Sequence, residues 1–261
     1  MKKIALILLA ALLCISLIAC EKEGGDDNEL DDYTPPSTQC KIDTGTLTFA
    51  DGPAETAIIT KYSGKSQLHE VTVPGTVNDR EVSAIGKEAF YYQTLITKIT
   101  LPETVTYIDD FAFAGCTALE TIVIPASVTR IGEFAFQGCT SLKSVVFAGT
   151  EVEDIEAFAF NDCSALETIV LPEGLKTIGD QAFGDCKAIT ALSMPATLET
   201  IGTFAFYGCE GLNKDGALVL TESIKEIGEF AFEGINKLYI VAPEGSYAAE
   251  YVDDMFESEI E

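Results

Sequence analysis

The sequence predicts a β-rich solenoid, a stack of coils of about 23 residues whose short strands pair in parallel ladders. Three observations lead to this fold class: a six-residue motif that recurs seven times, an alternating apolar segment after it, and atypical segments at both ends of the repeats. A single coil of this length cannot bury its own apolar side. Stacked coils can, because their apolar sides join into one continuous core.

The motif is Ile-Gly-x-x-Ala-Phe, with the glycine replaced in two copies. The spacings between successive copies are 23, 23, 24, 23, 23 and 26 residues. Such a constant phase predicts that equivalent side chains form columns inside the stack. The copies begin at Ile85, Ile108, Ile131, Ile155, Ile178, Ile201 and Ile227.

Each repeat also contains a predicted main strand, most clearly in Gly115–Pro125. Ile122 and Ile124 flank Val123 with the period of two that is typical of a strand, and Pro125 ends it. A second extended segment follows, and Glu133–Phe136 is expected to form one short helical or 3-10 turn. The two longer spacings predict surface loops at 148–150 and 213–216.

The segments outside the repeats predict an exported, lipid-anchored chain. Residues 1–19 contain two lysines followed by an apolar run, which is typical of a signal peptide. Their end resembles a bacterial lipobox, so Cys20 is expected to be lipidated; ordinary cleavage beside an unmodified Cys20 is the alternative. Residues 20–39 form an acidic tether with too few apolar side chains to fold. This tether resembles the surface-export signal of Bacteroidetes lipoproteins, which implies an outer-membrane lipoprotein exposed at the cell surface; display toward the periplasm is the alternative.

The two ends of the repeat region are predicted to be caps. Residues 40–83 contain three short strand-like segments and form an N-terminal cap with a degenerate first repeat. Residues 84–237 hold the seven motif copies. Residues 238–261 supply a last strand and a capping helix over Tyr247–Phe256.

The full pattern, Ile-Gly-x-x-Ala-Phe-x-x-Cys-x-x-Leu-x-x-Ile-x-Ile-Pro, resembles the BspA-type bacterial leucine-rich repeats from Val71 to about Val241. The resemblance implies a right-handed leucine-rich-repeat solenoid on a bacterial cell surface. Some members of that family bind host matrix proteins or mediate adhesion. A repeat scaffold does not by itself fix a ligand.

Composition and motifs argue against several other functions. The chain has 42 acidic and 16 basic residues, a net charge of −26, which disfavours nucleic acid and direct contact with anionic lipid and favours a monomer. The membrane is therefore expected to be reached only through the N-terminal lipid. His69 is the only histidine and no hydrolase, zinc-protease or nucleotide-binding motif is found, so we predict a surface histidine, no enzyme and no cofactor.

Two sets of residues have a chemical and a structural interpretation. The acidic pairs Asp109-Asp110, Glu153-Asp154 and Asp253-Asp254 could hold Ca²⁺, but none fits an EF-hand loop and solvated carboxylates are expected.

One cysteine lies three residues after the repeat phenylalanine in five coils. Buried free thiols are favoured over disulfides for this column, because parallel side chains orient their Cβ atoms poorly for a bridge. The cysteines are Cys116, Cys139, Cys163, Cys186 and Cys209.

The candidate ligand face is the outward row of the main strands, which is small, β-branched and almost uncharged. Solenoids commonly bind along such a face, although β propensity alone would also select these residues. The row is Lys98, Thr100, Thr121, Val123, Ser144, Val146, Thr168, Val170, Ala191 and Ser193. Three tyrosines in turns between coils, Tyr91, Tyr92 and Tyr207, are further candidates.

The function expected from these features is a non-catalytic interaction or adhesion module that binds a protein or glycan of a host or neighbouring cell. The alternative is a structural spacer or assembly component of the bacterial cell envelope. The sequence does not identify the ligand.

Overall fold

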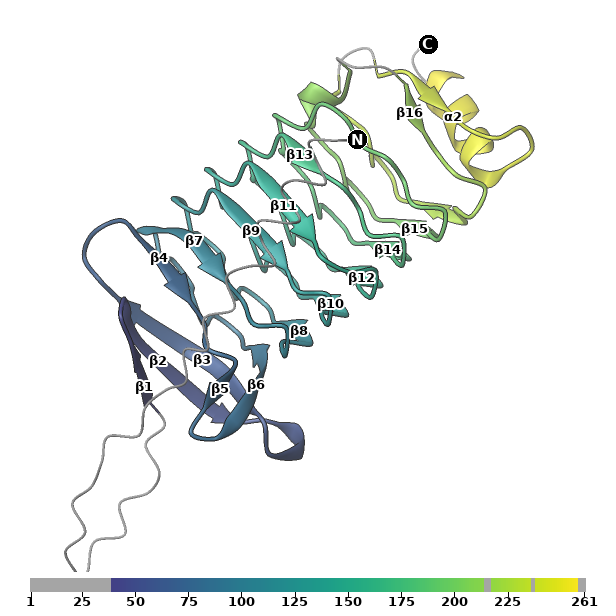
Figure 1. Cartoon of the computed structure of the whole chain (residues 1–261). Helices are drawn as coiled ribbons and strands as arrows, with labels where there is room; N and C mark the ends of the chain where they lie inside the picture. Colours follow the sequence, from purple (N-terminus) through teal and green to yellow (C-terminus); the bar gives the residue numbers. More distant parts are fainter. Residues whose placement is uncertain (1–38, 214–216, 236–237, 258–261) are drawn as a thin grey trace, which may run out of the picture.

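The computed structural model describes residues 39–213, 217–235 and 238–257. The predicted signal peptide, Cys20 and nearly all of the tether lie outside these residues, as does most of the predicted loop at 213–216. The chain is a parallel β-solenoid of about eight turns with little helix. Figure 1 shows the coils stacked side by side into an elongated body. The predicted fold class is confirmed.

One side of the solenoid is a five-stranded parallel sheet, called the main sheet here. Its strands are the predicted main strands, in which alternate side chains are buried and exposed. A separate parallel pair, β16 (Leu218–Val219) and β18 (Ile240–Val241), is formed by the last two coils. The main sheet contains β4 (His69–Thr72), β7 (Ile96–Thr100), β9 (Thr121–Ile124), β11 (Ser144–Phe147) and β13 (Thr168–Ile169).

The second side is a larger sheet that contains one strand of each coil. Parallel pairing in constant register places the motif isoleucines in one column, for example Ile108, Ile131 and Ile155, and all of these are fully buried. The coil strands are β6 (Arg80–Ile85), β8 (Tyr107–Ile108), β10 (Arg130–Ile131), β12 (Asp154–Ile155), β14 (Thr177–Ile178), β15 (Thr200–Ile201) and β17 (Glu226–Ile227).

The third side, which we call the turn side, differs from the predicted helical turn. Ala135 N–H donates to the Gly132 carbonyl and Gln137 N–H to Phe134, the three-residue spacing of a 3-10 turn. Phe134, however, has a φ of 57°, so the segment is a run of tight turns of the type II kind instead of a helix. The remaining N–H groups donate to the next coil, as Phe134 does to Ala157 and Phe136 to Ala159. Every second amide therefore holds neighbouring coils together.

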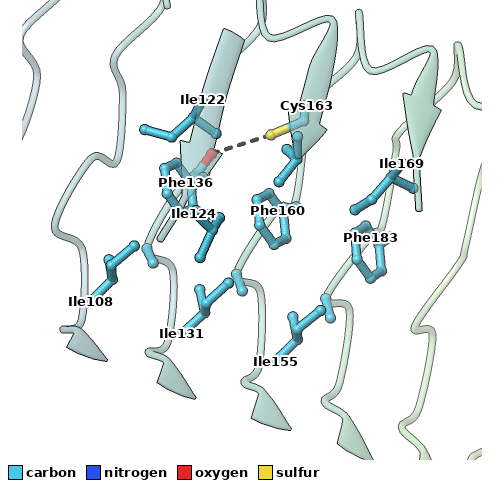
Figure 2. Close-up of a cluster of buried hydrophobic side chains, with 14 of the residues drawn as sticks. Ile108, Ile122, Ile124, Ile131, Phe136, Ile155, Phe160, Cys163, Ile169 and Phe183 are labelled. Atoms are coloured by element: carbon cyan, nitrogen blue, oxygen red, sulfur yellow. Dashed lines mark hydrogen bonds between the residues drawn. The ribbon is translucent and has the colours of Figure 1, made fainter. Parts of the chain in front are cut away.

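The core consists of columns of identical side chains between the three sides (Figure 2). The phenylalanine that ends each motif copy stacks on its counterpart in the next coil, with ring centroids 5.0 Å apart for Phe136 and Phe160 and 5.3 Å apart for Phe160 and Phe183. Offset stacking at this distance is favourable beyond the burial of area. The columns form only when the coils are in register, which explains the constant repeat length.

The N-terminal cap covers the first coil with an antiparallel meander. β1 (Gln39–Ile42), β2 (Gly45–Asp51) and β3 (Ala57–Gly64) pair in sequence, and β3 then pairs in parallel with β6 of the first full coil. A 3-10 turn, η1 (Pro53–Glu55), and β5 (Thr76–Val77), which pairs with β6, complete this end. The Tyr62 ring stacks on Phe90 at 5.3 Å and so prolongs the phenylalanine column into the cap.

The C-terminal end is covered by the helix α2 (Tyr247–Glu257), where a capping helix was predicted. Ser246 is its N-cap, because the Ser246 hydroxyl accepts a hydrogen bond from Ala249 N–H. Ala248 is fully buried, and Tyr251 meets the last ring of the column, Phe232, edge to face at 6.4 Å. A second 3-10 segment, η2 (Glu210–Asn213), precedes the longest insertion.

Candidate functional site

The register of the main sheet aligns the predicted ligand row. Lys98 pairs with Thr121, Thr121 with Ser144, and Ser144 with Thr168, and an isolated bridge joins Thr168 to Ala191. A second column lies two residues later along each strand. Eight of the ten side chains are exposed, and Ser144 and Val146 are half-buried. The structure therefore brings the predicted strand residues together on one outer face.

This outer face has little charge. Its one ionisable side chain among the ten is Lys98, which forms an ion pair with Glu70 at 3.5 Å. Val170 is 74% exposed and Val123 is 42% exposed. The last coils extend the apolar column with Val219 and Val241, which are paired in register. Such a surface loses less favourable hydration than a charged one when a partner covers it, because its polar groups are mostly uncharged hydroxyls.

Charged side chains adjoin this face and are paired between coils. Lys143, which precedes the row residue Ser144, lies 3.1 Å from Glu120, which precedes Thr121. Both side chains are more than half exposed, so the pair contributes little to stability. It does place charge at the border of the face and leave the centre neutral, the arrangement seen in many protein interfaces.

The three candidate tyrosines lie on the turn side and not in the main sheet. Tyr91 and Tyr92 lie between β6 and β7 and meet edge to face at 4.5 Å, and Tyr207 lies between β15 and β16, 5.6 Å from the Phe204 ring. Burial raises the pKa of Tyr91, with a smaller contribution from neighbouring Tyr92. The tyrosines therefore belong to a second surface.

That surface contains a ladder of phenylalanines that the motif analysis did not identify. They are the first aromatic residue of Phe-Ala-Phe, and they stack outside the core, with centroids 4.6 Å apart for Phe111 and Phe134 and 4.7 Å apart for Phe134 and Phe158. Together with the three tyrosines they are called the aromatic strip. The spacing within Phe-Ala-Phe gave no signal, since residues i and i+2 of an extended segment lie on one face. The positive φ of the first phenylalanine, which the motif does not reveal, separates the two rings. The phenylalanines are Phe111, Phe134, Phe158, Phe204 and Phe230.

All five strip phenylalanines have a positive φ, between 55° and 58°. This region is unusual for a bulky side chain and costs about 1–2 kcal/mol relative to ordinary backbone. Stacking returns about 0.5–1.5 kcal/mol per pair. The two effects nearly balance for Phe134, which stacks on a phenylalanine in each neighbouring coil, whereas Phe230 has one stacking partner and is 51% exposed and so gains less.

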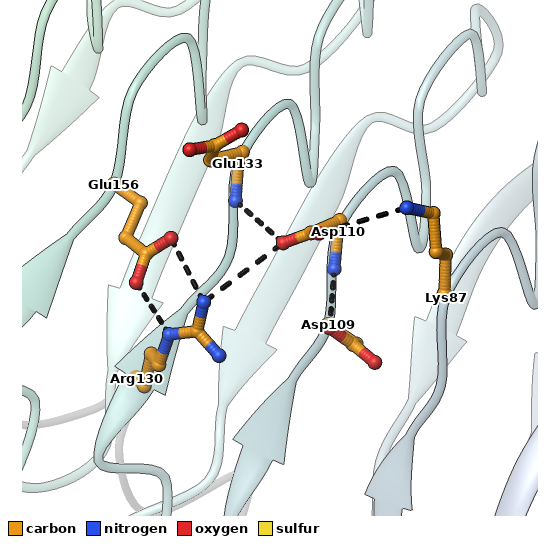
Figure 3. A network of polar contacts seen from close by, with 6 residues as sticks. All are labelled: Lys87, Asp109, Asp110, Arg130, Glu133 and Glu156. Atoms are coloured by element: carbon orange, nitrogen blue, oxygen red, sulfur yellow. Dashed lines mark hydrogen bonds and ion pairs between the residues drawn. The ribbon is translucent and has the colours of Figure 1, made fainter.

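A polar network runs beside the strip (Figure 3). The Asp110 carboxylate accepts a hydrogen bond from Glu133 N–H at 3.2 Å and lies 3.8 Å from the Lys87 ammonium and 3.9 Å from Arg130. Arg130 also binds both carboxylate oxygens of Glu156, and this hydrogen bonding raises the pKa of the guanidinium. The network connects four successive coils. Among the described residues, no group of three or more metal-binding side chains occurs.

The repeat cysteines form the predicted internal column, and all five are free and buried. Each thiol donates to a phenylalanine carbonyl, as Cys116 does to Phe90 at 3.1 Å and Cys163 does to Phe136 at 3.3 Å. Burial raises the pKa of the Cys116, Cys163 and Cys209 thiols well above the ordinary value of a cysteine. Since the thiolate is the reactive form, this column is suited to packing and poorly suited to chemistry.

His69 is half-buried in the N-terminal cap, which differs from the predicted surface position. Its Nε2 lies 2.8 Å from the Tyr62 hydroxyl and its Nδ1 lies 2.6 Å from the Gln67 carbonyl. Both ring nitrogens are therefore used in structural contacts.

None of the helices in the described ranges is long and apolar enough to span a bilayer.

Comparison with known proteins identifies the repeat type. The family model of the BspA type Leucine rich repeat region matches residues 83–213 and 176–251 in six copies, which is more than half of the chain. The curated proteins include no match.

Several solved structures share the fold. A T. pallidum leucine-rich repeat protein is 28% identical, with a TM-score of 0.67, over 79% of this chain and 92% of that one. A Bacteroides ovatus leucine-rich repeat protein is 30% identical, with a TM-score of 0.67, over 79% of this chain and 54% of that one. A leucine rich cell surface protein of Faecalibacterium prausnitzii is 28% identical, with a TM-score of 0.66, and is covered over 55% of its length. The chain thus spans only about half of the last two proteins.

Proposed function

The chain belongs to the BspA-type leucine-rich repeat family, and from this premise we propose that it is a non-catalytic module that binds a protein partner along the outer face of the main sheet. The observation that carries the proposal is the low charge of that face in a chain with a net charge of −26. Random placement of 42 acidic residues among 261 would put one or two in ten positions, and the row holds none. Apart from Lys98, the row consists of Thr, Ser, Val and Ala in consecutive coils.

Geometry supports a protein partner in particular. The row is in register from coil to coil, and apart from Lys98 its exposed groups are methyls and hydroxyls on a sheet, so binding needs little ordering of side chains. Contacts spread over several coils give affinity by accumulation and not through one deep pocket. A polar border with a neutral centre matches the usual anatomy of protein interfaces.

We further propose that the module is displayed on the outer surface of a bacterial cell by lipid attached to Cys20. The cell-surface protein of Faecalibacterium prausnitzii among its structural relatives supports this location. Two or more acyl chains would hold the protein stably on a membrane. The variant Cys20→Ala should move the protein from the detergent phase to the aqueous phase in a detergent-partition assay. Unchanged partitioning would disprove the lipid anchor.

A pair of matched charge variants tests the binding face. Thr121→Glu/Thr168→Glu places two carboxylates in the row, and Thr106→Glu/Thr129→Glu adds the same charge at exposed threonines in the connections that lead into the second sheet. Surface proteins of host cells and of neighbouring bacteria would be cross-linked to each variant and to the unmodified chain. We expect the cross-linked partner to be lost only with the row variant. Equal loss, or no loss, with both variants would contradict the proposed face.

A further inference from the structure

We propose that the aromatic strip on the turn side is a second docking surface, which takes a basic segment of a partner protein that also carries apolar side chains. This inference goes beyond the main-sheet face and does not depend on it, because the two surfaces lie on different sides of each coil. It rests on exposure, on charge, and on a contact that the chain makes with itself.

The aromatic side chains of the strip are not required by the turn that holds them. Glu88 and Gln181 occupy the same motif position in two other coils, and both also have a positive φ, of 58° and 49°. The backbone therefore forms this turn with a polar residue as well. Phenylalanine in the other five coils brings backbone strain and exposed apolar surface together, a combination that favours a functional reason for retaining it.

The ends of the strip are its most exposed parts. Phe230 is 51% exposed at the C-terminal end, and Tyr92 is 62% exposed at the N-terminal end. Tyr92 packs against Gly115, where a Cβ would come within 3.0 Å of the ring, so the glycine leaves room for the aromatic side chain. A partner could cover the rings at either end without moving the backbone.

The chain itself shows the contact that a basic partner would make. The Lys87 ammonium lies 5.8 Å from the centroid of the Phe111 ring and 3.8 Å from the Asp110 carboxylate. An aromatic face and a carboxylate thus hold one cation together. Figure 3 shows Lys87 directed toward Asp110 on this side of the coils.

The C-terminal half of the strip holds a ring and a carboxylate, with no basic side chain at the position equivalent to Lys87. Phe204 takes the place of Phe111 in its coil, and Asp180 stands where Lys87 stands in the preceding coil. The Asp180 carboxylate accepts a hydrogen bond from Thr203 N–H at 2.7 Å, which fixes it beside the base of the Phe204 turn. The ring and the carboxylate are both present, and a basic side chain from another molecule would complete the set.

The negative net charge of the chain favours a positively charged partner. With 42 acidic and 16 basic residues, the chain repels a second copy of itself and any acidic surface. A segment that is only basic would be attracted everywhere on this molecule. Apolar side chains are needed to select the strip, because they gain from covering the exposed phenylalanine and tyrosine edges.

The absence of tryptophan from the chain permits a direct binding test. The probe is a short synthetic peptide of lysine and leucine with one tryptophan, whose fluorescence shifts to the blue when it is buried. A matched peptide has serine in place of leucine. We expect the lysine-leucine peptide to bind with a blue shift, and the lysine-serine peptide to bind roughly tenfold more weakly.

Variants locate the binding on the strip. Phe230→Asn removes the exposed ring but keeps a residue that tolerates positive φ, so folding is preserved. Phe230→Asn should weaken binding of the lysine-leucine peptide roughly tenfold, and Phe230→Tyr should restore that binding. The control Val219→Asn, on the other surface, should leave the affinity for the peptide unchanged. The inference is overturned if the peptide fails to bind the unmodified chain, if both peptides bind equally, or if Phe230→Asn binds as the unmodified chain does. Thr121→Glu/Thr168→Glu should leave peptide binding intact, which separates this surface from the main-sheet face.

Discussion

Single residues show how the stack accommodates a coil that contains an inserted residue. In three coils, a serine or threonine hydroxyl two residues after the strand-ending proline donates to a carbonyl of the preceding coil, as Ser127 does to Val105 at 2.6 Å and Thr197 does to Leu175 at 2.8 Å. Gly174 occupies this position in the coil that follows the one-residue insertion at 148–150. A Cβ at Gly174 would lie 1.9 Å from the Thr150 carbonyl oxygen. The insertion therefore takes the space of a side chain, and glycine compensates for it.

We predict that Gly174→Thr, which restores the residue type of the other coils, destabilises the protein by about 1–3 kcal/mol, because the coils must separate to admit the side chain. Urea unfolding followed by circular dichroism measures this. Gly75→Ala is the matched control, since the nearest atom to a Cβ there is 3.8 Å away. A gain in stability from Gly174→Thr would show that the carbonyl moves easily and that glycine has no compensating role.

The thiol column predicts a loss of stability in alkali. Burial raises the pKa of Cys116, Cys163 and Cys209 in the folded state, so the unfolded chain releases protons first as the pH rises. The stabilisation is complete below the unfolded pKa, about 8.5, and declines above it until the folded pKa is reached. The urea midpoint should fall between about pH 8 and pH 10, and fall less in Cys163→Ala. Equal slopes in the two proteins would assign the loss to other groups.

At the scale of the elements, alternation was a sufficient guide to the main strands. Ile122 and Ile124 are buried and Thr121 and Val123 are exposed, as the period of two predicts, and the candidate row followed from the same rule. The turn side could not be predicted equally well. A 3-10 turn and a type II turn share their hydrogen-bond spacing, and only the positive φ at residues such as Phe134 separates them. Because bulky residues rarely adopt that φ, local preference pointed to the wrong turn and concealed the outer phenylalanine ladder.

The terminal helix makes a prediction at this scale. Ala248 is fully buried against the last coil, so Ala248→Glu places a charge where no solvent reaches and should detach α2. Because each coil contacts only its neighbours, amide hydrogen exchange should become faster at residues 226–241 and stay unchanged at 96–147. Ala249→Glu, at a half-buried neighbouring position, is the control. Faster exchange along the whole chain would mean that the solenoid unfolds as one unit.

At the scale of the whole molecule, two electrostatic effects oppose one another. Exposed ion pairs connect successive coils, as in Lys143–Glu120 at 3.1 Å and Lys225–Glu199 at 2.7 Å, and salt weakens them. The excess negative charges, which give the net charge of −26, repel one another, and salt weakens this repulsion as well. Exposed pairs contribute little individually, whereas the excess of 42 acidic over 16 basic side chains acts on every coil. Self-repulsion should therefore dominate.

This balance predicts that added salt stabilises the protein. Raising the ionic strength from about 0.01 M to about 0.15 M shortens the Debye length from about 30 Å to about 8 Å, so repulsion between distant coils fades while contact pairs are screened less. The urea midpoint should rise over this range in sodium chloride and rise less in sucrose of the same osmolarity, which stabilises by exclusion from the surface and does not screen charge. A lower midpoint in sodium chloride would mean that the cross-coil pairs, and not the net charge, control the stability of the stack. In that case removing one cation, as in Lys143→Gln, should lower the midpoint more at low salt than at high salt.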